Sequence, residues 1–493
     1  MNLILVTIDC LRADHVGFMG YPRPVMPTLD RLAHASIVLE NAQVTGTPTF
    51  FSFPAIFASR YPLSFGRDVV GIPPHCPTLA SVLTARGYAA AGLNAGNPYL
   101  TRQFGYAQGF GAWYDFLTEK EMPELAAPPT DQERPSLRRR LNRGLEQMAR
   151  PIPWTWQLYR ELYFQYSWRV RVRTHNLKAP YQYTPAEKLT ARALEWLTTQ
   201  ARAPFFLWLH YMDAHHPRYS PSEVFSSIGA PNLSRKRQFF LNQVWLRGDV
   251  SAAYLARYRQ EFVNTYDAGI RRVDDQLQNI IHKLEQQGIW DETAIVVLGD
   301  HGEEFLEHGS VGHLPPKLYQ ELLHVPLLIH APSRHTPRRM ATPFGVIDLA
   351  PTLLTMLGVE APASFQGVSR WDSLIKGNLT PAPIISEAIE NCRNLQHVQS
   401  RLQPRLLAVR EGPHKLLANF AEPSIEFFDL RRDAAEQESL AVNAAPRASR
   451  ELLQTARAHL HMTRCTESSR ERFEARVSEI RHELERRAHT NSV

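Results

Sequence analysis

Continuous apolar runs recur along the chain and alternate with segments of helical periodicity. The runs are Leu3–Ile8, Val38–Ala42, Pro204–His210 and Ala294–Leu298. Runs of this length and composition are typical of strands buried on both faces of a parallel sheet. Helices are predicted at Pro185–Thr199 and Tyr254–Gln287, and another begins near Pro27. This alternation predicts an α/β fold with a doubly wound, mostly parallel sheet.

Acidic side chains directly follow two of these predicted strands. Asp9 comes after Leu3–Ile8, while Asp300 and His301 follow the last apolar run, separated from it by Gly299. In open α/β sheets, ligands bind at the carboxyl ends of the strands. Carboxylate and imidazole together suit a hard or borderline divalent metal ion. The pattern therefore predicts a metal site at the carboxyl ends of these two strands. If only Asp300 and His301 are considered, an ordinary polar loop is the alternative.

The composition is that of an ordinary soluble enzyme. The 493 residues are 44% hydrophobic and 21% charged, which allows a large core and argues against general disorder. The four cysteines are scattered without a CxxC pair, so the sequence indicates neither a disulfide framework nor a zinc knuckle. A reducing compartment is therefore expected. Neither a secretory signal nor a membrane-spanning run is recognised, so we expect a cytoplasmic protein. Much of the net charge of +6 lies in a single segment.

Further motifs follow in order along the chain. They are the hydroxyl-rich turn from Val44 to Pro62 that ends Ser-Arg-Tyr-Pro, Phe205–Pro217, Tyr319–Glu321 before His324–Ile329, and Asp348–Leu354. Together with Asp9 and Asp300-His301-Gly302, this series resembles the sulfatase family of the alkaline phosphatase superfamily. The resemblance spans nearly the whole chain except the segment near 120–180 and the tail. It implies an alkaline-phosphatase-like sheet sandwiched by helices, with a small C-terminal antiparallel sheet subdomain.

The change of pattern after Gly367 agrees with such a subdomain. Short strands are predicted at Ile384–Glu387, Leu406–Arg410, His414–Asn419 and Ile425–Leu430. We predict a sulfatase-like catalytic α/β domain over 1–375, with an insertion at about 117–180, and a small α+β subdomain over 376–465. Residues 466–493 are charged without a clear apolar stripe, which favours a helical or frayed tail in solvent.

The expected nucleophile differs from that of sulfatases, which convert a Cys or Ser in a C/S-x-P-x-R signature to formylglycine. Counting back from Arg60, the equivalent residue is Thr49, with Phe51 and Phe53 in place of Pro and Arg, so this conversion is not expected. A threonine here is similar to the phosphodiesterases, phosphoethanolamine transferases and lipoteichoic acid synthases of the superfamily. Because a hydroxyl needs metal activation, Thr49 would be both ligand and nucleophile. The alternatives are a local hydrogen-bonding role in the turn and Ser52 as nucleophile.

The resemblance and the strand ends together imply a set of metal ligands. They are Asp9, Thr49, Asp300 and His301, which would hold one divalent ion such as Mn²⁺, Zn²⁺, Mg²⁺ or Ca²⁺. Many sulfatases carry a second Asp where this chain has Cys10, and a neutral residue lowers the negative charge of the site. We expect Cys10 to be a packed residue rather than a ligand.

Histidines complete the predicted site. By resemblance to the phosphoethanolamine transferases, His215 and His313 lie across the metal from Thr49, where they would bind the transferred group and protonate the leaving oxygen. Three further candidates for substrate binding are His308, Lys317 and Arg12. Asp213 with the nearby histidines leaves a second metal open, although its Asp-x-His spacing departs from that of two-metal phosphodiesterases. A surface or helix-capping role is the alternative for each histidine.

The insertion has an unusual composition. Its segment 137–173 joins a basic run, Leu137–Arg143, to Trp154, Trp156, Tyr159, Tyr163, Phe164, Tyr166 and Trp168. We expect a lid or packing insertion, with peripheral membrane contact or an acidic partner as alternatives. No recognised nucleic-acid module accompanies the charge, so no nucleic-acid partner is expected.

Three functions remain. The first is metal-dependent hydrolysis or transfer of phosphate esters, either phosphodiesters or phosphomonoesters, with Thr49 as nucleophile and a small-molecule, lipid or glycan ester as substrate. The second is sulfuric ester hydrolysis, which the family favours and Thr49 disfavours. The third is a non-catalytic binding protein on the same fold, which is disfavoured because the expected metal ligands and His313 are all present.

Overall fold

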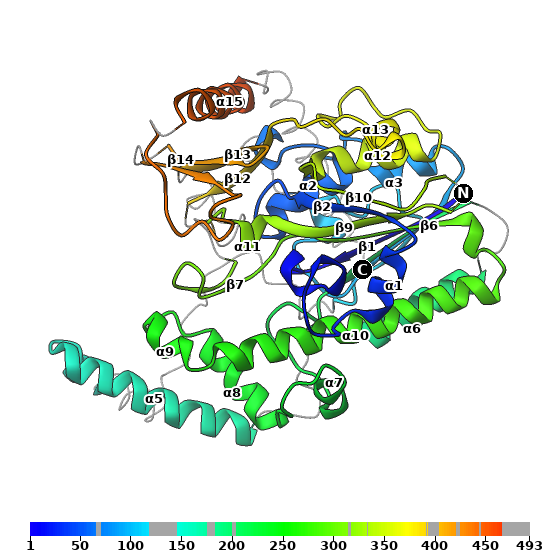
Figure 1. The fold of residues 1–493 in the computed structure, drawn as a ribbon. Coiled ribbons are helices and arrows are strands. Elements are labelled where there is room, and N and C mark those ends of the chain that lie inside the picture. The colour runs from blue at the N-terminus through cyan, green and yellow to red at the C-terminus, as the bar shows by residue number, and fades with distance from the viewer. Residues whose placement is uncertain are drawn as a thin grey trace, which may run out of the picture.

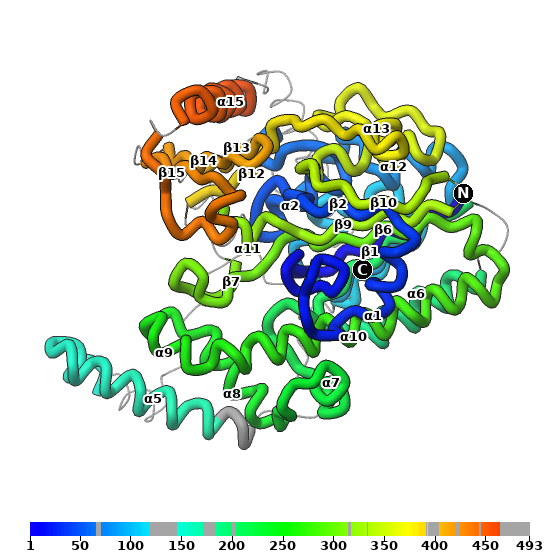
Figure 2. Tube along the Cα trace, in the orientation of Figure 1, coloured from blue at the N-terminus to red at the C-terminus, as the bar shows by residue number. Residues whose placement is uncertain are grey.

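The computed structural model describes most of the chain, as Figures 1 and 2 show. The described residues are 1–65, 71–117, 145–174, 183–199, 204–313, 317–332, 334–390, 392, 404–420, 424–442 and 445–465. The predicted tail lies outside them, as do residues 118–144 and 175–180 of the predicted insertion. Of the described helices, none combines the length and apolar character that crossing a bilayer requires.

A nine-stranded sheet forms the centre of the molecule (Figure 1). Its strands are β1 Asn2–Ile8, β2 Ile37–Gln43, β3 Ala89–Asn94, β4 Ala112–Tyr114, β5 Phe205–Tyr211, β6 Thr293–Gly299, β9 His324–His330, β10 Arg338–Met340 and β11 Phe344–Gly345. The order is β10-β2-β9-β6-β1-β5-β3-β4, and β11 pairs with β2. β9 runs antiparallel to both of its neighbours, and the other pairings are parallel. The predicted mostly parallel sheet is confirmed.

Alternate residues of the central strand β1 enter two separate cores. Leu3 and Leu5 belong to one hydrophobic cluster, and Ile4 and Val6 to the other, because successive side chains of a strand point to opposite faces. Helices therefore cover both faces of the sheet (Figure 1). They are α1 Pro27–Ala33, α6 Ala186–Thr199 and α10 Arg259–Gln286 on one side, and α2 Thr49–Ala58, α3 Leu79–Thr84, α12 Leu349–Met356 and α13 Trp371–Lys376 on the other.

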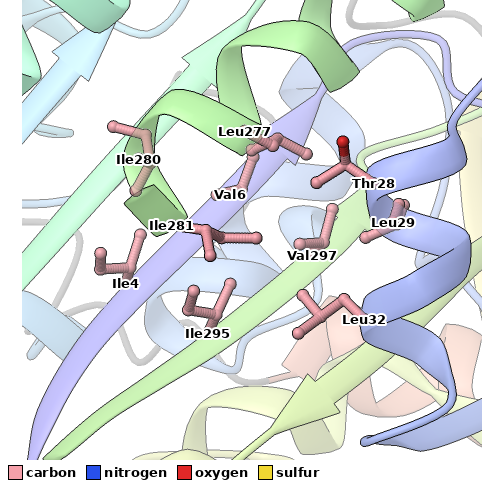
Figure 3. A pocket seen from close by; sticks show the side chains of 10 residues that line it. All are labelled: Ile4, Val6, Thr28, Leu29, Leu32, Leu277, Ile280, Ile281, Ile295 and Val297. Carbon is pink, nitrogen blue, oxygen red and sulfur yellow. The ribbon is translucent and has the colours of Figure 1, made fainter. Parts of the chain in front are cut away.

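Helix α1 begins at Pro27, as predicted, and is held by a side chain from α10. The backbone N–H groups of Thr28 and Leu29 each donate to the Asp274 carboxylate over 2.9 Å. Burial raises the pKa of Asp274 to about 6. Figure 3 shows the apolar side chains that pack between these two helices, β1 and β6, around a cavity of about 10 Å³. A gap of this size has room for about one water and is a packing defect rather than a binding site.

A second, four-stranded antiparallel sheet follows in the C-terminal part. Its strands, in spatial order, are β12 Ile384–Ile389, β13 Arg405–Glu411, β14 His414–Asn419 and β15 Ser424–Asp429. Helix α15, Pro446–Cys465, packs Leu452, Ala456 and Leu460 against it. The predicted small sheet and its closing helix are therefore present. The predicted boundary after residue 375 falls at the end of α13.

Two local predictions differ from the structure. The helix predicted at Tyr254–Gln287 is divided into α9, Ala252–Ala256, and α10, and nothing in the periodicity marks the break. The predicted turn over Val44–Pro62 contains α2, whose ten residues are all buried, so no polar face reveals its helical period. The remaining elements are α5 Pro153–Thr174, α7 Ser222–Ser227, α8 Arg235–Trp245, α11 Gln320–Leu323 and the hairpin of β7 Glu304–Phe305 with β8 Val311–Gly312.

Candidate active site

Asp9 and Asp300 meet at the carboxyl ends of the neighbouring strands β1 and β6. Both side chains are fully buried, and their carboxylates lie within 4.8 Å of one another. The backbone N–H groups of Cys10 and His301 donate to Asp300 Oδ1 over 3.1 and 2.9 Å. Cys10 has a φ of 62°, an uncommon left-handed conformation for a residue with a side chain. The loops after both strands therefore fix Asp300 Oδ1 and leave Asp300 Oδ2 directed into the cluster.

His301 presents one ring nitrogen to the two acids. Its Nδ1 lies 2.8 Å from Gly302 O and donates to this carbonyl, so Nε2 carries the lone pair. Nε2 lies 3.6 Å from Asp300 Oδ2, 3.9 Å from Asp9 Oδ1 and 3.3 Å from Thr49 Oγ1. Burial, with the charge of nearby His313, lowers the pKa of His301 to about 3. The imidazole is thus neutral and in the tautomer that a metal ligand requires.

Thr49 is the first residue of α2, and the helix brings its hydroxyl to the acids. Thr49 Oγ1 donates to Asp9 Oδ2 over 3.3 Å. The Asn97 side chain donates to the same carboxylate oxygen over 3.1 Å and to Thr49 Oγ1 over 3.5 Å. A helix N-terminus also favours negative charge in its first turn. The hydroxyl is therefore placed where an anionic group would be bound.

The donor set fits a divalent cation. Asp300 Oδ2 is buried and has no hydrogen-bond partner among the described residues. Burial and the charge of Asp9 raise the pKa of Asp300 well above its ordinary value. Burial also opposes ionisation of Asp9, but the surrounding histidines, His215 first, hold its pKa well below the usual range. An ion held by the four predicted ligands would offset the acidic charge and give Oδ2 a partner.

A second group of side chains lies next to His301 and Cys10. The ring of His313 is 4.5 Å from that of His301 and 5.1 Å from that of His215. His313 Nδ1 lies 2.9 Å from Glu303 Oε1, and Glu303 is also paired with buried Arg218. Burial opposes both charges, but Arg218 lowers the pKa of Glu303 to about 2, and Glu303 raises that of His313. Glu303 therefore orients His313 and stabilises its protonated form.

Cys10 lies between the two groups. Its thiol donates to Asp9 Oδ1 over 3.0 Å and lies 3.4 Å from His313 Nδ1. Burial and the surrounding carboxylates, Glu303 first, raise the pKa of the thiol well above its ordinary value. Cys10 is fully buried, in line with the packed role predicted for it. The sulfur of Cys10 and one ring nitrogen each of His215 and His313 nevertheless lie within 4.8 Å of one another. These three atoms are therefore candidate ligands for a second metal.

Asp213 does not join this second group. Its Oδ1 lies 3.0 Å from Arg272 and accepts from the backbone N–H of Ala186 over 3.3 Å, next to α6 and α10. Burial raises the pKa of Asp213 to about 6, even with Arg272 beside it. The predicted second-metal set that included Asp213 is therefore not assembled, because its carboxylate is turned toward the helices.

Two of the predicted substrate-binding residues are occupied by protein contacts. Arg12 makes two hydrogen bonds to Asp14, of 2.8 and 2.7 Å, and one of 2.9 Å to Glu307. Lys317 Nζ donates to Glu304 Oε2, His308 O and Ser310 Oγ over 2.6, 2.7 and 2.8 Å. These contacts support a structural role in the loop after β6, and substrate binding by Arg12 and Lys317 stays a prediction.

His308 joins the same loop to the C-terminal part. Its Nδ1 lies 2.7 Å from Glu321 Oε1 and its Nε2 lies 3.1 Å from Glu436 O. The ring stacks on Tyr319 with centroids 3.6 Å apart. Both nitrogens are engaged, so these contacts also favour a structural role for His308, and its substrate-binding role stays a prediction.

Three polar residues of the cluster were absent from the predicted site. Asn97 follows β3, a strand that the sequence did not reveal because Ala and Gly dominate it. Glu303 directly follows Asp300-His301-Gly302, and this adjacency is the signal that could have identified it. His210, the last polar residue inside β5, places Nε2 3.3 Å from Asp9 Oδ2. The signal in the sequence is that His210 ends the apolar run Pro204–His210, at the carboxyl end of a predicted strand.

Comparison with known sequences finds distant relatives of the chain. The multifunctional alkaline phosphatase superfamily protein PehA of Trinickia caryophylli is 25% identical over 301 residues, which cover 54% of this chain and 57% of that relative. The chain thus matches little more than half of that protein's length.

Two solved structures share the fold. One is a protein in complex with its substrate D-Glucosamine-2-N, 6-O-disulfate, with a TM-score of 0.65, 16% identity, and coverage of 94% of this chain and 98% of the other. The second is the phosphonate monoester hydrolase of Agrobacterium radiobacter, with a TM-score of 0.60, 16% identity, and coverage of 94% and 96%.

Two family models match the chain. The model described as Sulfatase covers residues 1–359, and the model described as N-sulphoglucosamine sulphohydrolase, C-terminal, covers residues 315–463. The first match takes in every residue of the cluster described above, from Asp9 to His313. The chain is a member of the sulfatase family of the alkaline phosphatase superfamily.

Proposed function

We propose that this sulfatase-family chain is a metal-dependent hydrolase or transferase of phosphate esters, with Thr49 as its nucleophile. The observation that carries the proposal is the threonine itself. Its hydroxyl lies 3.3 Å from both Asp9 Oδ2 and His301 Nε2, at the start of α2. A threonine side chain has no route to the formylglycine on which sulfatases depend, but its alkoxide is a competent nucleophile toward phosphorus.

Ser52 is a poorer candidate for the nucleophile. Its hydroxyl donates to Thr49 O over 3.0 Å, one turn farther into α2, and the residue is fully buried. That hydrogen bond is the local helix contact expected for a serine inside a helix. Thr49 is therefore the hydroxyl that remains at the cluster of acids.

The reaction would proceed in two displacements. Thr49 Oγ1, having lost its proton to solvent, forms a bond to phosphorus while the bond to the leaving oxygen breaks, and His313, held by Glu303, donates a proton to that oxygen. Asn97 and the first turn of α2 would orient the phosphoryl oxygens. Water then gives a proton to His313 and attacks phosphorus, which releases Thr49 with phosphate from a monoester or with a phosphomonoester from a diester, whereas an acceptor alcohol would give transfer. His215, beside His313, would bind the transferred group.

A divalent ion at Asp9, Thr49, Asp300 and His301 would lower the pKa of the hydroxyl and offset charge on the phosphoryl group. Asp9 and Asp300 together offer two carboxylates to one ion, and His301 adds a neutral nitrogen. This set accommodates Mn²⁺, Zn²⁺, Mg²⁺ or Ca²⁺, since oxygen and imidazole ligands are compatible with each to differing degrees.

Sulfate-ester hydrolysis is the second candidate. Its support is the family match and the likeness to a structure solved with a sulfated glucosamine. Support for the phosphorus reaction comes from the likeness to a phosphonate monoester hydrolase and from the alkaline phosphatase superfamily relative, together with Thr49. A small-molecule, lipid or glycan ester is compatible with either candidate.

The two candidates are separated by turnover of an aryl phosphomonoester, a bis-aryl phosphodiester and an aryl sulfate, each with added divalent metal. We expect a phosphate ester to be the best substrate and Thr49→Ala to reduce its turnover at least about a thousand-fold. Thr49→Ser should keep part of the activity because it retains a hydroxyl. Ser52→Ala is the matched control, since it removes a neighbouring hydroxyl of the same helix, and should keep most of the activity. Aryl sulfate as the preferred substrate, undiminished by Thr49→Ala, would exclude the phosphorus reaction.

A further inference from the structure

One face of helix α5 exposes a row of large apolar side chains. Trp154, Leu158, Leu162 and Tyr166 follow one another at intervals of four residues, and they are 66%, 52%, 61% and 48% exposed. Residues four apart lie on the same side of a helix. These four residues, here called the α5 stripe, therefore form a continuous apolar line on one side. Three further exposed apolar residues precede the helix: Leu145, Met148 and Ile152.

Other side chains of α5 attach the helix to the body of the protein. Phe164 and Trp168 contact Phe240 of α8, with ring centroids 6.0 and 5.1 Å apart. Arg247 lies 2.6 Å from Glu161 and also sits over the Phe164 ring at 4.4 Å. Figure 1 places α5 at the edge of the molecule, beyond α8 and α9. Within the described part of the chain, these contacts anchor the helix to α8 and the loop after it, and the four stripe side chains keep about half or more of their surface exposed.

The charge of this segment matches an anionic surface. Residues 145–174 contain five arginines and two glutamates, a net charge of +3. Exposed Arg169 lies at the C-terminal end of the stripe, just beyond Tyr166. Trp and Tyr are the residues enriched at the boundary between lipid headgroups and acyl chains. An exposed line of Trp, Leu and Tyr in a segment with an excess of arginines is a combination also found in helices that lie in the plane of a membrane surface.

We propose that α5 docks the protein on the surface of a bilayer that contains anionic phospholipids. The α5 stripe enters the headgroup region, and exposed Arg169 contacts lipid phosphates and carboxylates. A helix of 22 residues is about 33 Å long, so it lies flat across several headgroups. A line one helix wide suits a planar lipid surface better than a protein interface, which needs on the order of 800 Å² from each partner.

The test is co-sedimentation of the full-length protein with lipid vesicles. Phosphatidylcholine vesicles are compared with vesicles in which about a quarter of the lipid is phosphatidylserine, at low and at physiological salt. We expect binding to the anionic vesicles that weakens as salt rises, since the Debye length shortens from about 30 Å at low salt to about 8 Å. Little binding to phosphatidylcholine alone is expected.

The matched variants change equal numbers of exposed apolar side chains. Leu158→Ser with Leu162→Ser should lower the partition coefficient about ten-fold or more, because two buried side chains are lost from the lipid contact. Val368→Ser with Val442→Ser is the control, since these residues are 53% and 41% exposed on other parts of the molecule. It should bind as wild type does. Circular dichroism and turnover of a soluble ester, unchanged in both variants, show that each is folded.

Four outcomes would overturn the proposal. The wild-type protein could fail to bind anionic vesicles, or the stripe variant could bind them as strongly as wild type. An equal loss in the control variant would show a nonspecific effect of surface polarity. A wild-type dimer in solution that the stripe variant converts to monomer would show that a second copy covers the stripe instead. Co-sedimentation measures binding to vesicles and not turnover, and Thr49→Ala should bind them as wild type does, so the result is independent of the chemistry at Thr49.

Discussion

Replacing Asp300 by Asn separates the contribution of a bound metal to stability from the contribution of the protein itself. Asp300 Oδ1 accepts from the N–H groups of Cys10 and His301, and the amide oxygen of Asn can accept both. Oδ2, which has no hydrogen-bond partner among the described residues, becomes an uncharged NH₂ group. The variant therefore keeps the shape of the site and removes one negative charge next to Asp9.

The expected magnitudes follow from the two buried carboxylates. Their separation of within 4.8 Å corresponds to a repulsion of at least about 3.5 kcal/mol at an effective dielectric constant of about 20. Protonation of Asp300, whose pKa is raised by burial and by Asp9, relieves part of it. Without metal, Asp300→Asn should thus unfold no more easily than wild type, and its free energy of unfolding should rise by about 3.5 kcal/mol less the part that protonation already relieves. Metal at a hundred times its Kd should stabilise wild type by about 2.7 kcal/mol and the variant by far less.

The assay is thermal unfolding of both proteins in chelator and in Mn²⁺ or Zn²⁺, with elemental analysis of the purified samples. The order of Tm should reverse: the variant equals or exceeds wild type in chelator and falls below it in metal. Asp300→Ala should likewise lose both metal and activity. A variant that retains its full metal content, or that metal stabilises as much as wild type, would refute the assignment of Asp300 as a ligand.

Two further predictions concern the residues around the metal site. Glu303→Gln leaves buried Arg218 without its charged partner, so it should lower the free energy of unfolding by about 3–5 kcal/mol in urea titrations. The same change removes the carboxylate that raises the pKa of His313, so the basic limb of kcat/KM against pH should move to lower pH; an unmoved limb would exclude His313 as the acid. For His308, burial lowers and Glu321 raises the pKa, with a net rise above 6.5. The stabilisation by this pair is therefore complete below the unfolded pKa and is lost as pH rises through the folded pKa. His308→Gln should cost more stability at about pH 6 than at about pH 9, and an equal cost at both would show that the charge of His308 contributes nothing.

The parts of the fold that the sequence predicted are those with a local signal. Continuous apolar runs identified β1, β2, β5 and β6, and the residues at their carboxyl ends gave Asp9, Asp300 and His301. Parallel topology then brings these strand ends to one edge, where the structure indeed assembles them.

The missed features depend on contacts between distant parts of the chain. Helix α2 is buried on all sides, so its residues show no alternation of apolar and polar faces. Glu303 and Arg218 are 85 positions apart, and no local pattern predicts their pairing. Asp213 sits in a histidine-rich segment, yet its carboxylate turns toward Arg272 on α10. Spacing along the sequence could not show which way that side chain points.

The most direct test of Thr49 as the nucleophile is mass spectrometry of the peptide that contains it. Protein incubated with a slow phosphodiester substrate and quenched in acid should carry one phosphoryl group on Thr49, still esterified with the alcohol that does not leave, since such a threonine ester survives acid quenching. Thr49→Ala should carry none, and Ser52→Ala should be labelled as wild type is. An aldehyde or hydrated aldehyde at any residue of α2, or full turnover by Thr49→Ala, would contradict the proposed reaction.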